Sequence, residues 1–250
     1  MSAACHYFHF GLIVTGKTER GYLPNLFKAL AAARICTFEI IGFVSQRDPI
    51  TSTTRQLVMV GTGKIIPDRD TEQIGLPARG YISRSACHFV IVIDDLEHDR
   101  RELAQEVYNR YRKALDTILR DHQKHRASVH FLVNMLEAYF FADAKALNAV
   151  LNLALEDYDG DVEDIRHPKG DLKQLCAYHE IEHGSQIMER LDLEHVLSNP
   201  ATCAWLRTLF AWCVRVLERY PYFETLGLSG KFCLDNGRLS PITSVQLDML

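Results

Sequence analysis

The 250-residue sequence has no long run of apolar residues. A helix that spans a membrane needs about 20 consecutive apolar residues, and no stretch approaches this length, so we expect no membrane insertion. The first residues, MSAACHYFHFG, also lack the basic start, apolar centre and small-residue cleavage site of a secretory signal. We therefore expect a cytoplasmic protein.

Paired cysteines and an excess of positive charge are missing too. The seven cysteines are scattered, odd in number and without a Cys-x-x-Cys pair, which predicts reduced, mostly buried thiols rather than a cysteine metal cluster. The net charge of -4 excludes a surface coated with positive charge for non-specific binding of nucleic acid. A local basic channel is still compatible with this charge.

What the sequence does contain is an alternation of apolar and helical segments. The apolar segments predict four strands, at Tyr7–Val14, Ile35–Val44, Cys87–Asp94 and Ser128–Val133. Helical patterns follow the last two, over 96–124 and 134–155. Strands separated by helices predict an α/β fold with a doubly wound, mostly parallel sheet. Ligands of such folds lie beyond the carboxyl ends of the strands.

The composition divides the chain near residue 155. Residues 1–155 form the predicted α/β domain, in which 45–85 is rich in Gly, Pro, Asp, Thr and Ser and is expected to be a loop or insertion with one short strand in RQLVMV. The acidic stretch EDYDGDVEDI that follows predicts a solvated loop. Residues 156–250 are expected to form a helical C-terminal portion packed on the domain.

The segment Gly11–Thr18 matches the phosphate-loop pattern G-x-x-x-x-G-K-[ST]. A phosphate loop wraps backbone N–H groups round the anion, which favours small residues. Here the middle of the pattern holds Leu12, Ile13 and Val14, which are typical of a buried strand. We favour a first strand that ends near Thr15, and a P-loop ATPase remains the less favoured alternative.

Acidic side chains follow the third predicted strand. Asp94, Asp95 and Glu97 lie at its carboxyl end, and Asp95 and Glu97 have the D-x-E spacing that can direct two carboxylates at one ion. Mg²⁺ prefers such oxygens together with several retained waters. The alternative is that Glu97 simply stabilises the positive end of the next helix.

Several motifs in fixed order, IVTGKTERGYL, VIVIDDLEHD, NMLEAYFFAD, HPKGDL and HGSQIMERLDLEHVLSNP, resemble a prokaryotic family of uncharacterised TOPRIM-like proteins. The resemblance spans roughly Phe10 to Trp212 and implies a fold related to that of OLD-family nucleases. It also implies Mg²⁺ or Mn²⁺ as cofactor, an ATPase partner and an association with mobile elements or antiphage defence.

The resemblance also implies a set of site residues. Its first motif usually has glutamate where this chain has Thr15, while the family's second acidic position is kept as Glu19. Its D-x-D motif corresponds to Asp95-Leu96-Glu97. The implied metal ligands and catalytic residues are Asp94, Asp95, Glu97 and Glu137 for the metal, and Glu19 as acid or base with Lys169 at a phosphate.

Two functions are therefore expected as alternatives. The leading hypothesis is a magnesium-dependent nuclease that cuts DNA or RNA and works with an ATPase partner. A homo-oligomer is compatible with this hypothesis. Because threonine cannot shuttle a proton near neutral pH, Thr15 motivates the alternative, a regulatory or binding subunit that keeps the fold and has lost cleavage.

Overall fold

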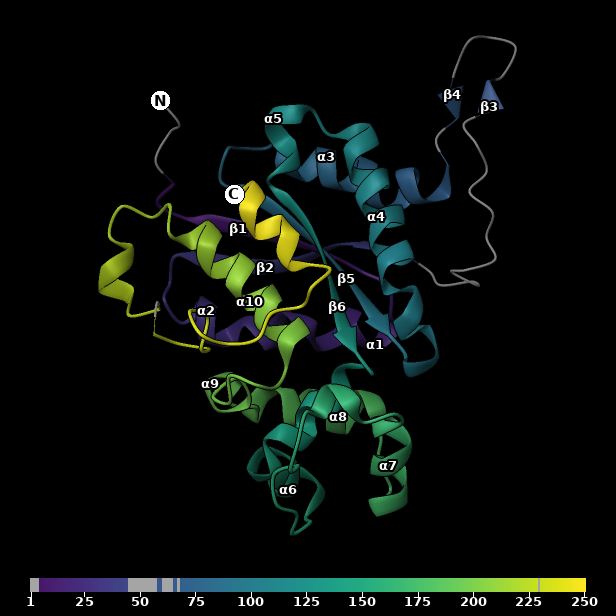
Figure 1. The fold of residues 1–250 in the computed structure, drawn as a ribbon, viewed down its shortest axis with the longest axis vertical. Coiled ribbons are helices and arrows are strands. Elements are labelled where there is room, and N and C mark those ends of the chain that lie inside the picture. The colour runs from purple at the N-terminus through teal and green to yellow at the C-terminus, as the bar shows by residue number, and fades with distance from the viewer. Residues whose placement is uncertain (1–4, 45–57, 60–64, 67, 229) are drawn as a thin grey trace.

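The computed structural model describes residues 5–44, 58–59, 65–66, 68–228 and 230–250. One sheet of four strands lies at its centre, formed by β1 (Phe8–Val14), β2 (Cys36–Phe43), β5 (His88–Leu96) and β6 (Ala127–Val133). The strand order is β2-β1-β5-β6, and every neighbouring pair is parallel. Helices surround this sheet (Figure 1), so the predicted α/β fold is confirmed.

Most of the helical elements are short, and the two longest are α4 and α10 (Figure 1). The helical elements are α1 (Lys17–Tyr22), η1 (Leu23–Phe27), α2 (Lys28–Ala31), η2 (Thr71–Gly75), α3 (Leu76–Ile82), η3 (His98–Leu103), α4 (Ala104–Ile118), α5 (Asp121–Lys124), η4 (Leu136–Ala142), α6 (Ala144–Leu151), η5 (Val162–Asp164), α7 (Pro168–Leu175), α8 (Glu180–Arg190), α9 (Leu193–Val196), α10 (Ala204–Leu217), η6 (Phe223–Leu226) and η7 (Ser244–Met249).

The sheet separates two hydrophobic cores because successive side chains of a strand point to opposite faces. Leu12 of β1 and Ile91 of β5 lie in the core that contains Trp212 of α10. Ile13 and Val92 lie in the other core, against Tyr111 of α4. All of these side chains are buried, so the central strands β1 and β5 need apolar residues on both faces, which is why they read as apolar runs.

Strand β1 includes the first four residues of the phosphate-loop pattern. Gly11 packs so closely against its neighbours that an added Cβ would lie 2.7 Å from Ile41 Cδ1 and 2.9 Å from the ring of Tyr81. The glycine therefore serves the packing of β1 against β2 and α3. The prediction that this segment is a strand is confirmed.

The expectation of a loop or insertion over 45–85 is wrong for its second part. Residues 68–85 contain η2 and α3, whose Ile74, Ala78 and Tyr81 are buried in the core on the α4 side. An added Cβ on Gly75 would lie only 2.6 Å from Ala114 O, so the glycine, which suggested a loop, permits close helix packing. Before it, β3 (Val58–Met59) and β4 (Ile65–Ile66) form an antiparallel pair, and 45–57, 60–64 and 67 lie outside the described residues.

Two of the predicted helices are interrupted. The helix expected over 96–124 divides into η3, α4 and α5, because Leu119 and Arg120 adopt extended backbone (ψ 139° and 154°). The helix expected over 134–155 consists of η4 and α6, separated by Asp143, whose carboxylate caps α6 by accepting a hydrogen bond from Ala146 N. Helix α6 ends at Asn152 in a left-handed conformation.

The expectation of reduced cysteines is wrong for two of the seven. Cys5 and Cys87 form a disulfide with a Cα–Cα distance of 5.6 Å. They precede β1 and β5, and because these neighbouring strands are parallel, both cysteines lie at the same edge of the sheet. The other five are free, and burial raises the pKa of Cys36 to about 12, so its thiol stays protonated.

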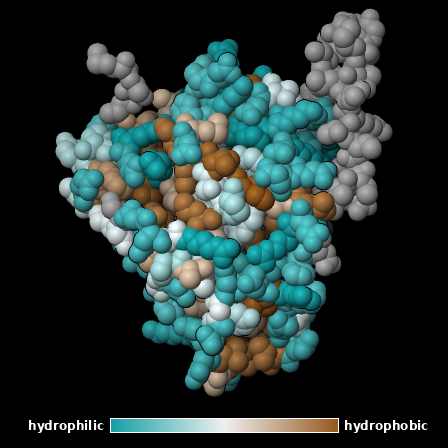
Figure 2. Space-filling view, viewed as in Figure 1, coloured by the Kyte–Doolittle hydropathy of each residue, from teal (hydrophilic) through white to brown (hydrophobic). Residues whose placement is uncertain are grey.

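Helices α6 to α9 gather beyond the carboxyl ends of β5 and β6, where α8 packs against α1 and α6 (Figure 1). Helix α10 returns to the sheet and packs on β6, and its core residues join those of β1 and β5 in one cluster. Apolar side chains gather in the view of Figure 2 over α10 and the C-terminal segment. In the described part of the chain, every helix is too short or too polar to cross a membrane.

The C-terminal segment protects the edge strand β6. Gln246 of η7 is buried, accepts a hydrogen bond from Val129 N and donates one to Val129 O, both at 2.8 Å. The glutamine side chain thus completes the hydrogen bonds of an edge strand, where unpaired backbone groups would invite association with other chains.

Replacing Gln246 by alanine is expected to lower the free energy of unfolding by about 2 kcal/mol, because two buried backbone groups of Val129 lose their partners. Urea denaturation measures the change. Val245→Ala, at the half-exposed neighbouring position, is the matched control and should leave stability nearly unchanged. Equal midpoints for the two variants would contradict the edge-capping role.

Candidate functional site

The buried carboxylate of Asp94 connects three elements at the carboxyl edge of the sheet. Its Oδ1 accepts a hydrogen bond from the hydroxyl of Thr15, which directly follows β1. Its Oδ2 accepts from Tyr111 Oη of α4 at 2.9 Å and from Arg100 Nη2 at 3.3 Å, the second contact being an ion pair. Both oxygens of this predicted metal ligand are therefore engaged by protein donors.

Burial and Asp94 together keep the neighbouring Tyr111 protonated. Burial, reinforced by the negative charge of Asp94, raises the pKa of Tyr111 well above its ordinary value. The phenol therefore stays protonated and donates its hydrogen bond to the carboxylate. The geometry indicates a structural role for Asp94 and places Thr15 beside Asp94 rather than in an open site.

The next acids on the chain lie on the other side of β5. By alternation along the strand, Asp95 faces the same side as Ile91 and Ile93, toward the core that contains α1 and α8, while Asp94 faces α4. Asp95 is half-buried and Glu97 is exposed just after the strand. At the carboxyl end of β5 the structure therefore exposes Glu97, while Asp95 is half-buried and its Oδ1 is shielded from solvent.

A pocket of about 390 Å³ lies next to Glu97. Its walls come from the ends of β5 and β6 and from the start of α7, and its lining residues are Glu97, His98, Asn134, Met135, Arg166, His167, Lys169 and Gly170. Two predicted site residues, Glu97 and Lys169, therefore line one cavity. Lys169 Nζ also forms an ion pair with Glu180 at the start of α8.

The wall of this pocket after β6 has an unusual backbone. Asn134 and Met135 both have positive φ, 56° and 75°. Asparagine adopts this region more readily than other non-glycine residues, whereas for methionine it is uncommon and costs free energy. Such strain is concentrated at functional sites in proteins. The turn directs the chain from β6 into η4, which carries Glu137.

Glu137 is buried at the start of η4, near Tyr178. Burial, together with the charges of Glu137 and Glu180, raises the pKa of Tyr178. A carboxylate in the apolar segment LEAYFFA is expected to need a polar neighbour, and Tyr178 is such a neighbour of Glu137. For Glu19 the structure describes the backbone, in α1 directly after β1, and the side chain lies outside the described part.

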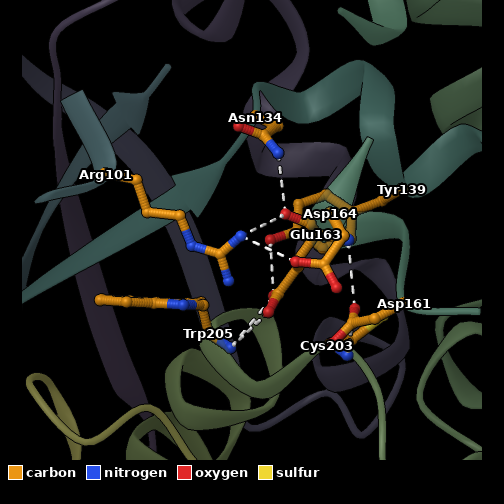
Figure 3. Close-up of polar contacts among 8 residues, drawn as sticks. All are labelled: Arg101, Asn134, Tyr139, Asp161, Glu163, Asp164, Cys203 and Trp205. Atoms are coloured by element: carbon orange, nitrogen blue, oxygen red, sulfur yellow. Dashed lines mark hydrogen bonds and ion pairs between the residues drawn. The ribbon is translucent and has the colours of Figure 1, made fainter. Parts of the chain in front are cut away.

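The sequence analysis did not identify one buried and hydrogen-bonded carboxylate, that of Glu163. Glu163, in the acidic stretch expected to be a solvated loop, is buried and accepts hydrogen bonds from Trp205 N (3.0 Å), Leu206 N (3.1 Å) and Tyr139 Oη (3.0 Å). Figure 3 shows this carboxylate pointing at the start of α10. The apolar neighbours Val162 and Ile165 were the available signal that part of the stretch is buried.

The Glu163 cluster supports the pocket wall. Asn134 Nδ2 donates to Glu163 O at 2.8 Å, and Arg101 pairs with Asp164 at 2.8 Å (Figure 3). Asp161 accepts from both Glu163 N and Cys203 N. These bonds fix the turn after β6 to the N-terminus of α10.

Glu163 should make stability depend on pH. Burial, more than the nearby Asp161, raises the pKa of Glu163 to about 7. The folded state therefore binds the proton more tightly than the unfolded state, so the stabilisation is complete below the ordinary pKa of 4.5 and is lost as the pH rises through 7. The loss is roughly 3 kcal/mol at most.

Glu163→Gln keeps an acceptor and does not titrate, so its unfolding free energy should fall less between pH 5 and pH 8 than that of the wild type. Urea midpoints at both pH values provide the test, and other titrating groups cancel in the difference. Glu156→Gln, an exposed acid of the same stretch, is the control. A wild-type pH dependence that survives in Glu163→Gln would refute the assignment.

Among the described residues, no three histidine, cysteine, aspartate or glutamate side chains gather so that they could hold a metal ion. Searches of curated proteins and of solved structures found no match. A family model described as "Domain of unknown function (DUF4276)" matches residues 15–210, which is most of the chain. The chain belongs to the DUF4276 family.

Proposed function

We propose that this protein is a TOPRIM-like nuclease that hydrolyses phosphodiester bonds of nucleic acid with Mg²⁺ or Mn²⁺. The observation that carries the proposal is the position of Asp95 and Glu97 at the carboxyl end of a central parallel strand, next to a pocket lined by Arg166 and Lys169. This edge is where doubly wound α/β folds bind their ligands. Acidic and basic side chains together suit a metal and a phosphate.

Two carboxylates, from Asp95 and Glu97, suit a magnesium ion that keeps several waters better than a metal ion coordinated entirely by side chains. Magnesium is commonly held by one or two carboxylates, several waters and the phosphate of the substrate, so three preassembled side chains are not required. Asp95 and Glu97 would supply the carboxylates. Bound there, the metal would neutralise charge on the phosphate and lower the pKa of a water.

The remaining roles fall to the protein's own side chains. Lys169 would hold a phosphate oxygen, and its ion pair with Glu180 fixes the ammonium group at the pocket wall. Glu19, in the first helix after β1, would act as acid or base, as the resemblance implies. Glu137, buried at the start of η4 after β6, would add a further negative charge to the metal site.

We further propose an ATPase partner, a role in antiphage defence, a homo-oligomeric state and a cytoplasmic location. The Cys5–Cys87 disulfide bears on the last point, because thiols in the cytoplasm are normally kept reduced. Counting free thiols in protein isolated under alkylating conditions tests the location: seven free thiols fit the cytoplasm, and five fit an oxidising compartment.

A second candidate function, a subunit that binds and no longer cleaves, is favoured by one observation. Thr15 is buried and donates to Asp94, so the position that usually holds the family's glutamate makes a structural contact here. Thr15→Glu would place two carboxylates side by side. A gain of nuclease activity in this variant favours the second candidate, and strong wild-type activity refutes it.

Asp95→Asn is expected to reduce cleavage of DNA or RNA on the order of 100-fold, because it removes one negative charge from the metal site while keeping the size of the side chain. Cleavage is measured with purified full-length protein in magnesium and in manganese. Asp235→Asn, an exposed aspartate of the C-terminal segment, is the matched control. Equal activity of the two variants would remove Asp95 from the site.

A further inference from the structure

The pocket beside Glu97 has two chemically different walls. One wall, at the ends of β5 and β6, offers acceptors in Glu97 and Asn134. The other, at the start of α7, offers cations and donors in Arg166, His167 and Lys169. Arg166 is exposed, and within the described residues its guanidinium has no hydrogen bond or ion pair, so its charge is available to a ligand.

The start of α7 adds backbone donors to the second wall. The first hydrogen bond of this helix is donated by Asp171 N to His167 O at 2.9 Å. Lys169 and Gly170 line the pocket, and their N–H groups come before this first bond, while Pro168 at the first helical position has no N–H. A helix N-terminus with free N–H groups favours an anion, above all a phosphate.

The first wall contains a polar atom that needs a partner. Asn134 is 1% exposed and its Nδ2 is bound to Glu163 O, but its Oδ1 has no hydrogen-bond donor among the described residues. Figure 3 shows the amide nitrogen turned toward Glu163 and the oxygen turned away from it. His98 Nδ1, at the same pocket, also has none within that part of the chain. Buried polar atoms without partners are costly and point to a missing ligand or water.

We propose that this pocket binds one nucleotide unit of the substrate through its phosphate. The phosphate lies between Arg166, Lys169 and the start of α7, and a hydroxyl or amino group of the same nucleotide donates to Asn134 Oδ1. This inference rests on the proposed function in one respect, namely that the ligand is part of a nucleic acid. A volume of about 390 Å³ is at the small end for ligand pockets, which suits a single unit rather than a duplex.

The test is calorimetric titration of the full-length protein with AMP and with inorganic phosphate, in EDTA so that binding is separated from metal and from cleavage. We expect AMP to bind at millimolar or lower concentration. Arg166→Ala should weaken both ligands about tenfold or more, since it removes a charge-assisted contact. Arg79→Ala, an exposed arginine of α3, is the control and should bind like the wild type.

Asn134→Gly tests the acceptor wall, since glycine tolerates the positive φ while the amide is removed. We expect weaker binding of AMP with unchanged binding of inorganic phosphate. Should this variant fail to fold, Asn134→Asp replaces it and should weaken both ligands through its negative charge. Absence of AMP binding, or an Arg166→Ala variant that binds like Arg79→Ala, would overturn the proposal.

The two proposals fail separately. AMP binding that depends on Arg166 in a protein without nuclease activity would refute the nuclease and keep the pocket. Cleavage that depends on Asp95 in a protein whose Arg166→Ala variant still binds AMP normally would do the reverse.

Discussion

A single buried carboxylate determines the geometry of the candidate site. Burying the charge of Asp94 is costly unless every lone pair is satisfied, and here Thr15, Arg100 and Tyr111 supply the donors. These donors come from the end of β1, from η3 and from α4, so the carboxylate fixes the edge of the sheet relative to the helices on one face. Because side chains alternate along a strand, holding Asp94 inward on the α4 side sends Asp95 to the other face. One residue step thus separates the structural acid from the acid for which we propose a chemical role.

The sheet could be predicted because its signal is local. The central strands β1 and β5 are mostly apolar, as a parallel sheet covered on both faces requires, and β1, β2, β5 and β6 all lie within a few residues of their expected bounds. The helices were harder, since Leu119 and Asp143 interrupt otherwise helical patterns for reasons that depend on packing and capping. Gly75 shows the same limit, because it suggests a loop until the nearby carbonyl of Ala114 is known.

The site could be predicted only as a list of residue types. Asp95, Glu97 and Lys169 were identifiable from motifs. That Glu97 and Lys169 line one pocket depends on how α7 packs beyond the strand ends, and no local sequence pattern reports this packing. The role of Glu163 was hidden because burial of an acid depends on distant donors, here the start of α10 some forty residues later. The disulfide is a similar case: Cys5 and Cys87 are 82 residues apart and become neighbours only through the order of the strands.

The division of the chain near residue 155 does not divide the site. The acceptor wall of the pocket belongs to the sheet, and the donor wall belongs to α7, after the acidic stretch. Glu163 and Asp161 of that stretch bind the start of α10, while Asn134 holds Glu163 from the sheet side. Any movement of α7 relative to β6 would therefore change the width of the pocket. The hydrogen bonds around Glu163 hold the stretch that precedes α7 to the turn after β6 and to the start of α10. The acidic stretch that was expected to be a solvated loop therefore connects the turn after β6 to the start of α10 through hydrogen bonds.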